Sequence, residues 1–375
     1  MSRRNKLRSR TPSPVKKPPH SATFEYRHTT MQLANVFVES EPEMPADVAA
    51  LVQQILQDRE EDAALDALIT TLAQTYTTDS RHLAGKCAGE GEWRVCTQLG
   101  LINHLNKYLS PMLSVSACEK PWNRFLKPVA ARLLVPPIFP PPELPTLTAF
   151  TTPTTTRSQN DRSSSAASVT ASDFTEDDPL QLSTPKPDIT VGLASNAIQK
   201  ALNLPYDVLL WLQSHPDNPT PFVSDPHQVP VGLRFPVLVV ESKGMNTGAN
   251  LIHAQNQAAV SAASALNILC ELDARAAPKS RSNDEVDQPA IVFSIATEGP
   301  THEIWVHYKV ADKYHMACLQ SCRTTLSGHT ETFVRSLAQI MRWAATEFQT
   351  KIVKKVDQLW MGLLADSVEE QARLG

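Results

Sequence analysis

One stretch of this sequence combines a strand of buried character with charged side chains at its end. The residues Phe235 to Val240 are almost all apolar, and Glu241, Ser242, Lys243 and Gly244 follow them directly. In a strand, residues i and i+2 share a face, so Glu241 and Lys243 are expected to point the same way. Charged groups at the end of a buried strand must be solvated, paired or bound to a metal, because an isolated buried ion costs many kcal/mol.

A second β-prone run lies upstream and begins with a carboxylate. Pro187 and Asp188 precede the residues Ile189 to Gly192, and together the two runs give the pattern PD…ExK. Carboxylates bind hard divalent cations, and such cations activate water and neutralise charge on a phosphate. The sequence therefore predicts a divalent-cation site, for Mg²⁺ or Mn²⁺, at Asp188 and Glu241.

Each residue of the pattern has an expected role in that chemistry. Asp188 and Glu241 would bind the metal, with the carbonyl oxygen of Ser242 as a further oxygen ligand. Lys243 would orient or help to deprotonate the attacking water and would offset negative charge in the transition state.

With this pattern the sequence resembles the PD-(D/E)XK nuclease-like proteins, and in particular a group of fungal nuclease-like domain proteins. The resemblance covers residues 185 to about 361 well and residues 89 to about 134 loosely. It implies an α/β fold with a restriction-endonuclease-like core, in which a mixed central sheet is flanked by helices, and this chain adds an N-terminal helical region. It also implies catalytic roles for Asp188, Glu241 and Lys243.

A glutamine completes the implied site. The fungal group carries one on the helix that follows the ExK strand, and here Gln257 matches it on a helix predicted from Asn250 to Asp273. An amide at that position can hydrogen-bond a base, a water or the lysine. Gln255 is the neighbouring candidate, and a glutamine on the solvated face of an Ala-rich helix is the structural alternative.

A helix predicted from Glu90 to Leu109 raises a further possibility. Its Glu92 and Trp93 resemble the Glu-Trp step of the fungal group's first core helix, where the acid can contribute to the site. A carboxylate in the first turn of a helix is also favourable on electrostatic grounds alone. The predicted apolar face of this helix comprises Val95, Leu99, Ile102, Leu105 and Leu109.

A rival PD pair, Pro216-Asp217, lies closer to Glu241 in sequence. The prolines that follow it exclude a strand. Asp188 is therefore preferred, although it lies 53 residues before Glu241.

The remaining patterns supply the elements that position these residues. Apolar spacing predicts helices over about 45–76, interrupted near Arg59 to Asp62, and over about 330–360. Three β-prone runs, at 291–296, 303–308 and 315–319, predict a meander that completes the sheet.

The chain thus divides into five segments around one interrupted domain. They are a disordered basic tail (1–30), a helical region that includes the first core helix (45–134), a Pro/Ser/Thr-rich linker or insertion (135–183), a nuclease-like core (184–361) and a C-terminal tail (362–375).

Charge and composition restrict the partners and the compartment. The first 20 residues hold seven Lys and Arg and no acid, so the net charge of −4 leaves −11 (−4 minus 7) on the rest. The tail is either a nuclear-localisation signal, a segment that contacts nucleic acid, or a solvated segment with neither role. No apolar run approaches the roughly 20 residues of a membrane helix, and no signal peptide is evident, so nucleus or cytoplasm is expected. The six cysteines form no CxxC pair, which favours reduced thiols over zinc.

Two functions of different classes follow. The first is a Mg²⁺-dependent nuclease, with nucleic acid as the partner and DNA preferred to RNA. The second is a catalytically silent nuclease-fold protein that serves as a binding or scaffold module, which the acidic body and long insertions favour. The sequence indicates no membrane partner and names no protein partner.

Overall fold

The computed structural model describes residues 20–39, 43–57, 62–109, 112–117, 119–129, 181–204, 208–214, 221–246, 248, 250–277 and 288–374. The basic tail up to residue 19, most of the Pro/Ser/Thr-rich segment and the rival Pro216-Asp217 pair lie outside these residues.

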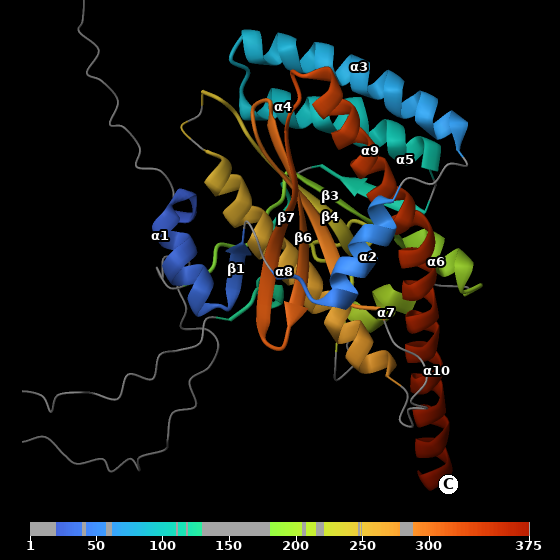
Figure 1. Ribbon diagram of the computed structural model, residues 1–375. Helices are drawn as coiled ribbons and strands as arrows, with labels where there is room; N and C mark the ends of the chain where they lie inside the picture. Colours follow the sequence, from blue (N-terminus) through green and yellow to red (C-terminus); the bar gives the residue numbers. More distant parts are fainter. Residues whose placement is uncertain are drawn as a thin grey trace, which may run out of the picture.

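A seven-stranded mixed sheet forms the centre of the described structure (Figure 1). Its order is β1-β7-β6-β5-β4-β3-β2. The strands are β1 (Val36–Glu39), β2 (Leu113–Ser116), β3 (Ile189–Ala194), β4 (Leu233–Lys243), β5 (Ile291–Glu298), β6 (Thr301–Val310) and β7 (Lys313–Arg323). Strands β2, β3 and β4 are antiparallel, β4 and β5 are parallel, and β5, β6 and β7 form the predicted antiparallel meander.

Helices surround this sheet. They are η1 (His20–Ala22), α1 (Phe24–Tyr26), η2 (Arg27–Met31), α2 (Ala46–Leu56), α3 (Ala63–Gly85), α4 (Glu90–Thr97), η3 (Gln98–Ile102), α5 (Asn103–Leu109), η4 (Arg124–Leu126), α6 (Ser195–Ala201), α7 (Val208–Ser214), α8 (Leu251–Ala276), α9 (Ser327–Trp343), η5 (Ala344–Phe348) and α10 (Gln349–Leu374). None of the helices in the described part of the chain is both long enough and apolar enough to cross a membrane.

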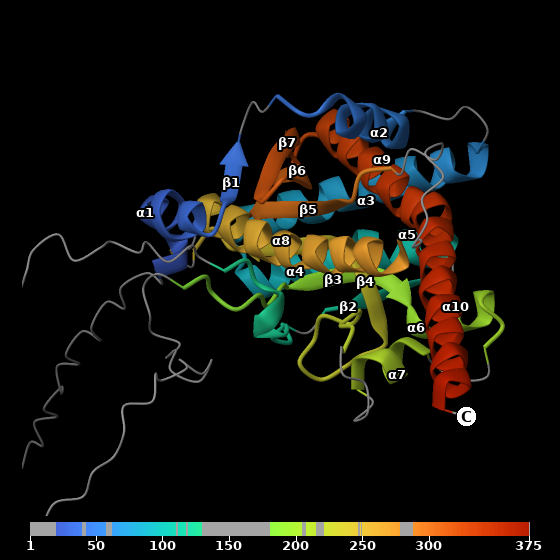
Figure 2. The ribbon, with the colours of Figure 1, turned by 90° about the horizontal axis from the view of Figure 1, so that it is seen from below.

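Two neighbouring residues of β6 show which helices cover which face. His302 is hydrogen-bonded to Tyr76 of α3 at 2.8 Å and packs edge-on against Phe333 of α9. Glu303 accepts a hydrogen bond from Gln255 of α8 at 2.7 Å. Because successive strand residues point to opposite faces, α3 and α9 cover one face and α8 covers the other. Figure 2 shows α8 running along its face of the sheet.

Strand β4 lies at the centre of this arrangement and is the buried strand that the sequence predicts. All 11 of its residues are buried. Helix α8 connects it to its parallel neighbour β5 and begins after Asn250, whose side chain accepts a hydrogen bond from the His253 amide at 2.9 Å. The predicted mixed sheet flanked by helices is therefore confirmed as an architecture.

The N-terminal prediction is wrong beyond residue 19. Residues 20–31 form short helices in which Tyr26 and Met31 are buried, and β1 then pairs in parallel with β7. Arg27 donates hydrogen bonds to Gln255 and Asn256 of α8. This segment has too few apolar residues to fold alone, so its contacts with α8, with β7 and with Ser183 make it a structured element.

The helices predicted at about 45–76 and at 90–109 are confirmed, but the apolar face predicted for residues 90–109 is wrong in part. Ile102 and Leu105 are buried, whereas Val95 and Leu99 are 48% and 52% exposed. Residues Gln98–Ile102 form a π-helical turn, which changes the phase of the helix. A single face at 3.6-residue spacing therefore cannot extend along the whole of Glu90–Leu109.

At the C-terminus, the predicted long helix is confirmed and is longer than expected. Its apolar residues from Phe333 to Val356 are buried as the spacing indicates. The segment after residue 361, predicted as a tail, continues α10 to Leu374.

Candidate functional site

The strand register brings Asp188 and Glu241 together. Ile189 pairs with Val240 in the antiparallel β3–β4 ladder, so the preceding Asp188 lies beside Glu241. The backbone N–H of Ser242 donates to Oδ2 of Asp188 at 2.7 Å. The 52 residues between Asp188 and Glu241 thus leave the sheet and come back to it, because α6 and α7 are inserted between two paired strands.

Lys243 lies two residues beyond Glu241 and contacts a different element. Its Nζ is 3.2 Å from Oε1 of Glu90, in the first turn of α4. Gly244 permits this contact, since a Cβ there would lie 2.5 Å from the backbone nitrogen of Glu90. The glycine that closes the strand in the sequence therefore lets the start of α4 pack against the end of β4.

Burial makes the two carboxylates electrostatically unfavourable neighbours. Asp188 is 3% exposed and Glu241 is 1% exposed. Burial, and next the charge of Asp188, raise the pKa of Glu241 well above its ordinary value, although Lys243 opposes the shift. Burial also raises the pKa of Asp188, against the effects of Lys243 and the Ser242 amide.

The ammonium of Lys243 responds in the opposite sense to the same carboxylates. Burial alone would lower the pKa of Lys243, but the charges of Glu241, Asp188 and Glu90 outweigh burial and raise it. Lys243 is therefore protonated and lies among the carboxylates of Glu241, Asp188 and Glu90.

A second cation lies at the edge of this cluster. Arg94 is one helical turn after Glu90, and its Nη1 is 3.4 Å from Oδ1 of Asp188. Arg94 also forms an ion pair with Glu119. Its side chain is 25% exposed, whereas that of Lys243 is 5% exposed, so Arg94 lies on the solvent side of the site.

Helix α8 presents three polar side chains at four-residue spacing to the same region. Ser261 donates to Oε1 of Glu241 at 3.4 Å. Gln257 and His253 lie one and two turns earlier on the same helical face. Within the described residues, the buried Oε1 atom of Gln257 has no hydrogen-bond partner. Burial, followed by the charge of Lys243, lowers the pKa of His253 to about 4.

The structure separates the two candidate glutamines. Gln255 accepts a hydrogen bond from Arg27 at 2.7 Å and donates one to Glu303, so it ties the N-terminal segment to the sheet. Gln257 is the one whose helical face contains the Glu241 partner Ser261. Gln257 is therefore the glutamine that the geometry associates with the carboxylate pair.

Glu92 is not part of the cluster. Its Oε2 accepts a hydrogen bond from the Gly89 amide at 2.9 Å, and its Oε1 is 3.1 Å from Nζ of Lys86. The α4 acid that contacts the site is Glu90, which the sequence analysis missed. The signal that could have found it is Arg94, which lies four residues after Glu90 and on its face.

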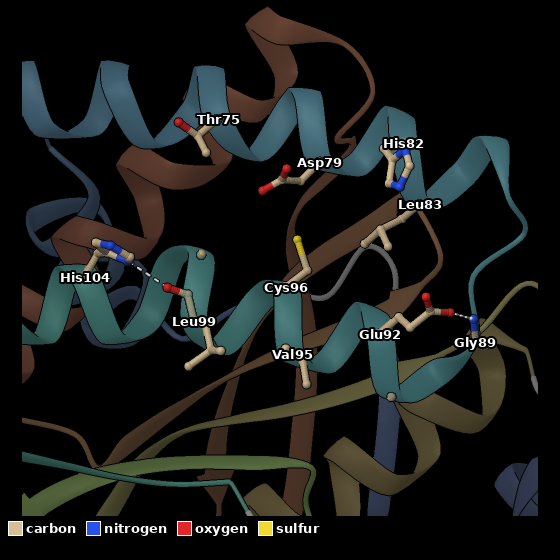
Figure 3. A pocket seen from close by; sticks show the side chains of 12 residues that line it. Thr75, Asp79, His82, Leu83, Gly89, Glu92, Val95, Cys96, Leu99 and His104 are labelled. Atoms are coloured by element: carbon tan, nitrogen blue, oxygen red, sulfur yellow. Dashed lines mark hydrogen bonds between the residues drawn. The ribbon is translucent and has the colours of Figure 1, made fainter.

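Glu92 instead lines a groove between α3 and α4 (Figure 3). The groove has a volume of about 870 Å³ and includes the exposed residues Val95 and Leu99. Burial, and next the charge of Asp79, raise the pKa of Cys96 on its wall to about 12, so this thiol is not a nucleophile. We therefore place the candidate chemistry at the end of β4 and not in this groove.

The donor set at the end of β4 fits a hard divalent cation. Three carboxylates, those of Glu90, Asp188 and Glu241, face two cations, and their oxygens are the ligands that Mg²⁺ and Mn²⁺ prefer. Within the described residues, no three His, Cys, Asp or Glu side chains are close enough to hold a metal by themselves. An ion there would have to complete its shell with backbone oxygen, water or substrate, and the Ser242 carbonyl remains a predicted ligand.

Comparison with known proteins identifies a family whose description names no function. A family model described as "Domain of unknown function (DUF7924)" matches residues 142–359, more than half of the chain. No curated protein and no solved structure matches it. The matched range contains Asp188, Glu241, Lys243 and Gln257, whereas Glu90 and Arg94 precede it.

Glu241→Gln tests the electrostatic description of the metal-free site. At pH 8 with EDTA, removal of one of two adjacent buried carboxylates should raise the free energy of unfolding, because burial and the charge of Asp188 both disfavour the ionised form of Glu241. Lys243→Met should lower it by about 3–5 kcal/mol, because it leaves the acids unpaired. Urea unfolding measures both.

Glu92→Gln, an exposed change on α4, is the control and should be nearly neutral. If Glu241→Gln destabilises the protein as much as Lys243→Met, the two residues are a structural ion pair and the description is wrong.

Proposed function

This chain belongs to the DUF7924 family, a domain of unknown function, and we propose that it is a metal-dependent nuclease that hydrolyses phosphodiester bonds, with DNA preferred to RNA. The observation that carries the proposal is the pairing of two buried carboxylates, Asp188 and Glu241, beside Lys243 at the end of β4. Two adjacent buried acids destabilise a fold, which makes them typical of a functional site, and a bound cation would relieve their repulsion.

In this proposal Asp188 and Glu241 bind Mg²⁺ or Mn²⁺, with the carbonyl of Ser242 as a further ligand. A cation bound there would supply charge neutralisation on the scissile phosphate and would lower the pKa of a water. Lys243 would donate hydrogen bonds to that water and to the phosphate, and Glu90 fixes the position of the Lys243 ammonium. The buried carbonyl oxygen of Gln257, which has no hydrogen-bond partner within the described residues, would accept a hydrogen bond from the water or from Lys243.

The architecture supports the restriction-endonuclease-like core that the PD…ExK resemblance implies. A mixed sheet carries the acid of the PD pair next to the strand with the ExK residues, and helices flank both faces. The antiparallel β3–β4 pairing is the feature that makes two motifs distant in sequence one site.

One observation favours a catalytically silent binding or scaffold protein as the second candidate. In the described residues no three-ligand metal cluster is preformed, and Arg94 and Lys243 already neutralise part of the acidic charge. Such a protein would keep the fold and bind nucleic acid without cleaving it.

Metal-induced stabilisation tests the ligand assignment. Mg²⁺ and Mn²⁺ should raise the free energy of unfolding of the wild-type protein by RT ln(1 + [L]/Kd), and so raise its melting temperature, because the ion binds only the folded state. Asp188→Asn and Glu241→Gln should each abolish this rise. Thermal melts in EDTA and in increasing metal concentration measure it.

Glu90 and Glu92 offer a matched pair of controls on one helix. Glu90→Gln should change the metal response, because it frees Lys243 to compete for the ligands, and Glu92→Gln should leave it unchanged. A metal response that survives in both Asp188→Asn and Glu241→Gln would overturn the assignment.

Cleavage of linear, circular and single-stranded DNA and of RNA, with and without Mn²⁺ or Mg²⁺, tests the activity itself. The wild-type protein should cleave DNA only with metal. Lys243→Ala should lower the rate by about two to four orders of magnitude, the usual effect of removing a positioned proton-transfer or charge-stabilising group, while metal binding persists. If the wild-type protein shows no metal-dependent cleavage of any substrate, the nuclease proposal is wrong and the catalytically silent binding protein is the remaining candidate.

A further inference from the structure

The loop of residues 119–127 is hydrogen-bonded to the segment that precedes Asp188. The Trp122 amide donates to the carbonyl of Pro185 at 2.9 Å, and Nζ of Lys127 donates to the carbonyl of Leu182 at 2.7 Å. Trp122 is fully buried, packs edge-on against His227 and forms an isolated β-bridge with it. Residues 119–127 are therefore fixed next to the segment that leads into Asp188.

The surface formed by this loop and its neighbours is basic. In residues 112–129 and 181–187 the single acid is Glu119, and it is paired with Arg94. Lys120 and Lys186 are exposed, and in the described structure neither forms an ion pair. A local excess of cations thus adjoins the site, although the chain after residue 20 carries a net charge of −11 (−4 minus 7).

An aromatic ring is presented on the same loop. Phe125 is 74% exposed, whereas Trp122 and Leu126 on either side of it are buried. The Phe125 amide donates to the Asn123 side chain at 3.1 Å, and the Arg124 guanidinium lies 5.2 Å from the ring centroid. The fold therefore exposes this ring to solvent and places the Arg124 guanidinium over it.

Arg94 connects this surface to the candidate active site. One atom, its Nη1, contacts both Glu119 of the loop and Asp188 of the carboxylate pair. A chain of phosphates that lies on the loop would therefore pass Arg94 before it reaches the carboxylates.

We propose that Arg94, Lys120, Arg124, Phe125 and Lys186, the entry surface, bind an unpaired segment of polynucleotide next to the active site. The cations contact its phosphates, and a base stacks on Phe125. An unpaired strand is the partner that fits, because a base offers its face to a protein ring only outside the duplex stack. The inference rests on the proposed function in taking the bound strand as the substrate.

Binding without metal tests the inference separately from cleavage. Fluorescence anisotropy in EDTA, with labelled single-stranded DNA, single-stranded RNA and duplex DNA, should show tighter binding of single strands. Lys120→Ala with Lys186→Ala should weaken binding at least about 10-fold at low salt and reduce the salt slope by about 1.4, or roughly 0.7 for each lost single-strand phosphate contact.

The matched control removes two exposed lysines from helices away from the entry surface. They are Lys107 of α5 and Lys200 of α6, and changing both to Ala causes the same loss of charge. This control should leave affinity and salt slope nearly unchanged. Equal weakening by the two double variants would show that binding follows net charge alone, and it would overturn the inference.

Phe125 allows a second, uncharged test. Phe125→Leu should weaken single-strand binding about 5- to 100-fold and duplex binding little, and Phe125→Trp should restore it. Thermal melts check that each variant is folded. Unchanged single-strand affinity in Phe125→Leu, or equal competition by polyglutamate, would contradict a stacked polynucleotide.

The two proposals fail in different ways. If strand binding depends on the entry surface but the protein shows neither a metal response nor cleavage, the nuclease proposal is wrong and the proposed role of the entry surface stands. Metal-dependent cleavage that is insensitive to all entry-surface variants would do the reverse.

Discussion

The structure depends on one constraint, which is that two carboxylates must be tolerated side by side in the interior. Asp188, which directly precedes β3, lies beside Glu241 of β4, and both are almost completely buried. Hydrogen bonds from the Ser242 amide and from Ser261 satisfy part of their need, and Lys243 supplies one positive charge. What remains is an excess of negative charge that a divalent cation would neutralise.

Much of the surrounding structure follows from how that cluster is enclosed. Gly244 allows the start of α4 to approach β4, which brings Glu90 to Lys243 and Arg94 to Asp188. These α4 residues precede the range matched by the family model, and so does β2, which pairs with β3. The site and its sheet are therefore built from the family region together with the residues before it.

The sequence predicts the elements whose burial is periodic and local. Strand β4, the meander of β5 to β7, and helices α8 and α9 are confirmed because their apolar residues follow one period over their length. Asp188, Glu241 and Lys243 could be grouped from their motif, and the β3–β4 register brings them into proximity.

What the sequence could not predict depends on contacts between distant segments. Residues 20–31 and β1 are ordered by α8 and β7, which no local pattern reveals. The π-helical turn at 98–102 altered the predicted face of its helix. The Glu-Trp resemblance points to Glu92 and not to Glu90, because it fixes the residue type but not the direction of the side chain, which capping of α4 determines.

The location of a bound Mn²⁺ ion tests the central claim most directly. Anomalous diffraction from crystals grown with Mn²⁺ would reveal its position, since Mn²⁺ and Mg²⁺ share oxygen ligands. We predict an ion coordinated by both Asp188 and Glu241, with Arg94 displaced from Asp188 and Lys243 still beside Glu90. Crystals at saturating Mn²⁺ that show no ion at these carboxylates, with Arg94 still on Asp188, would contradict it.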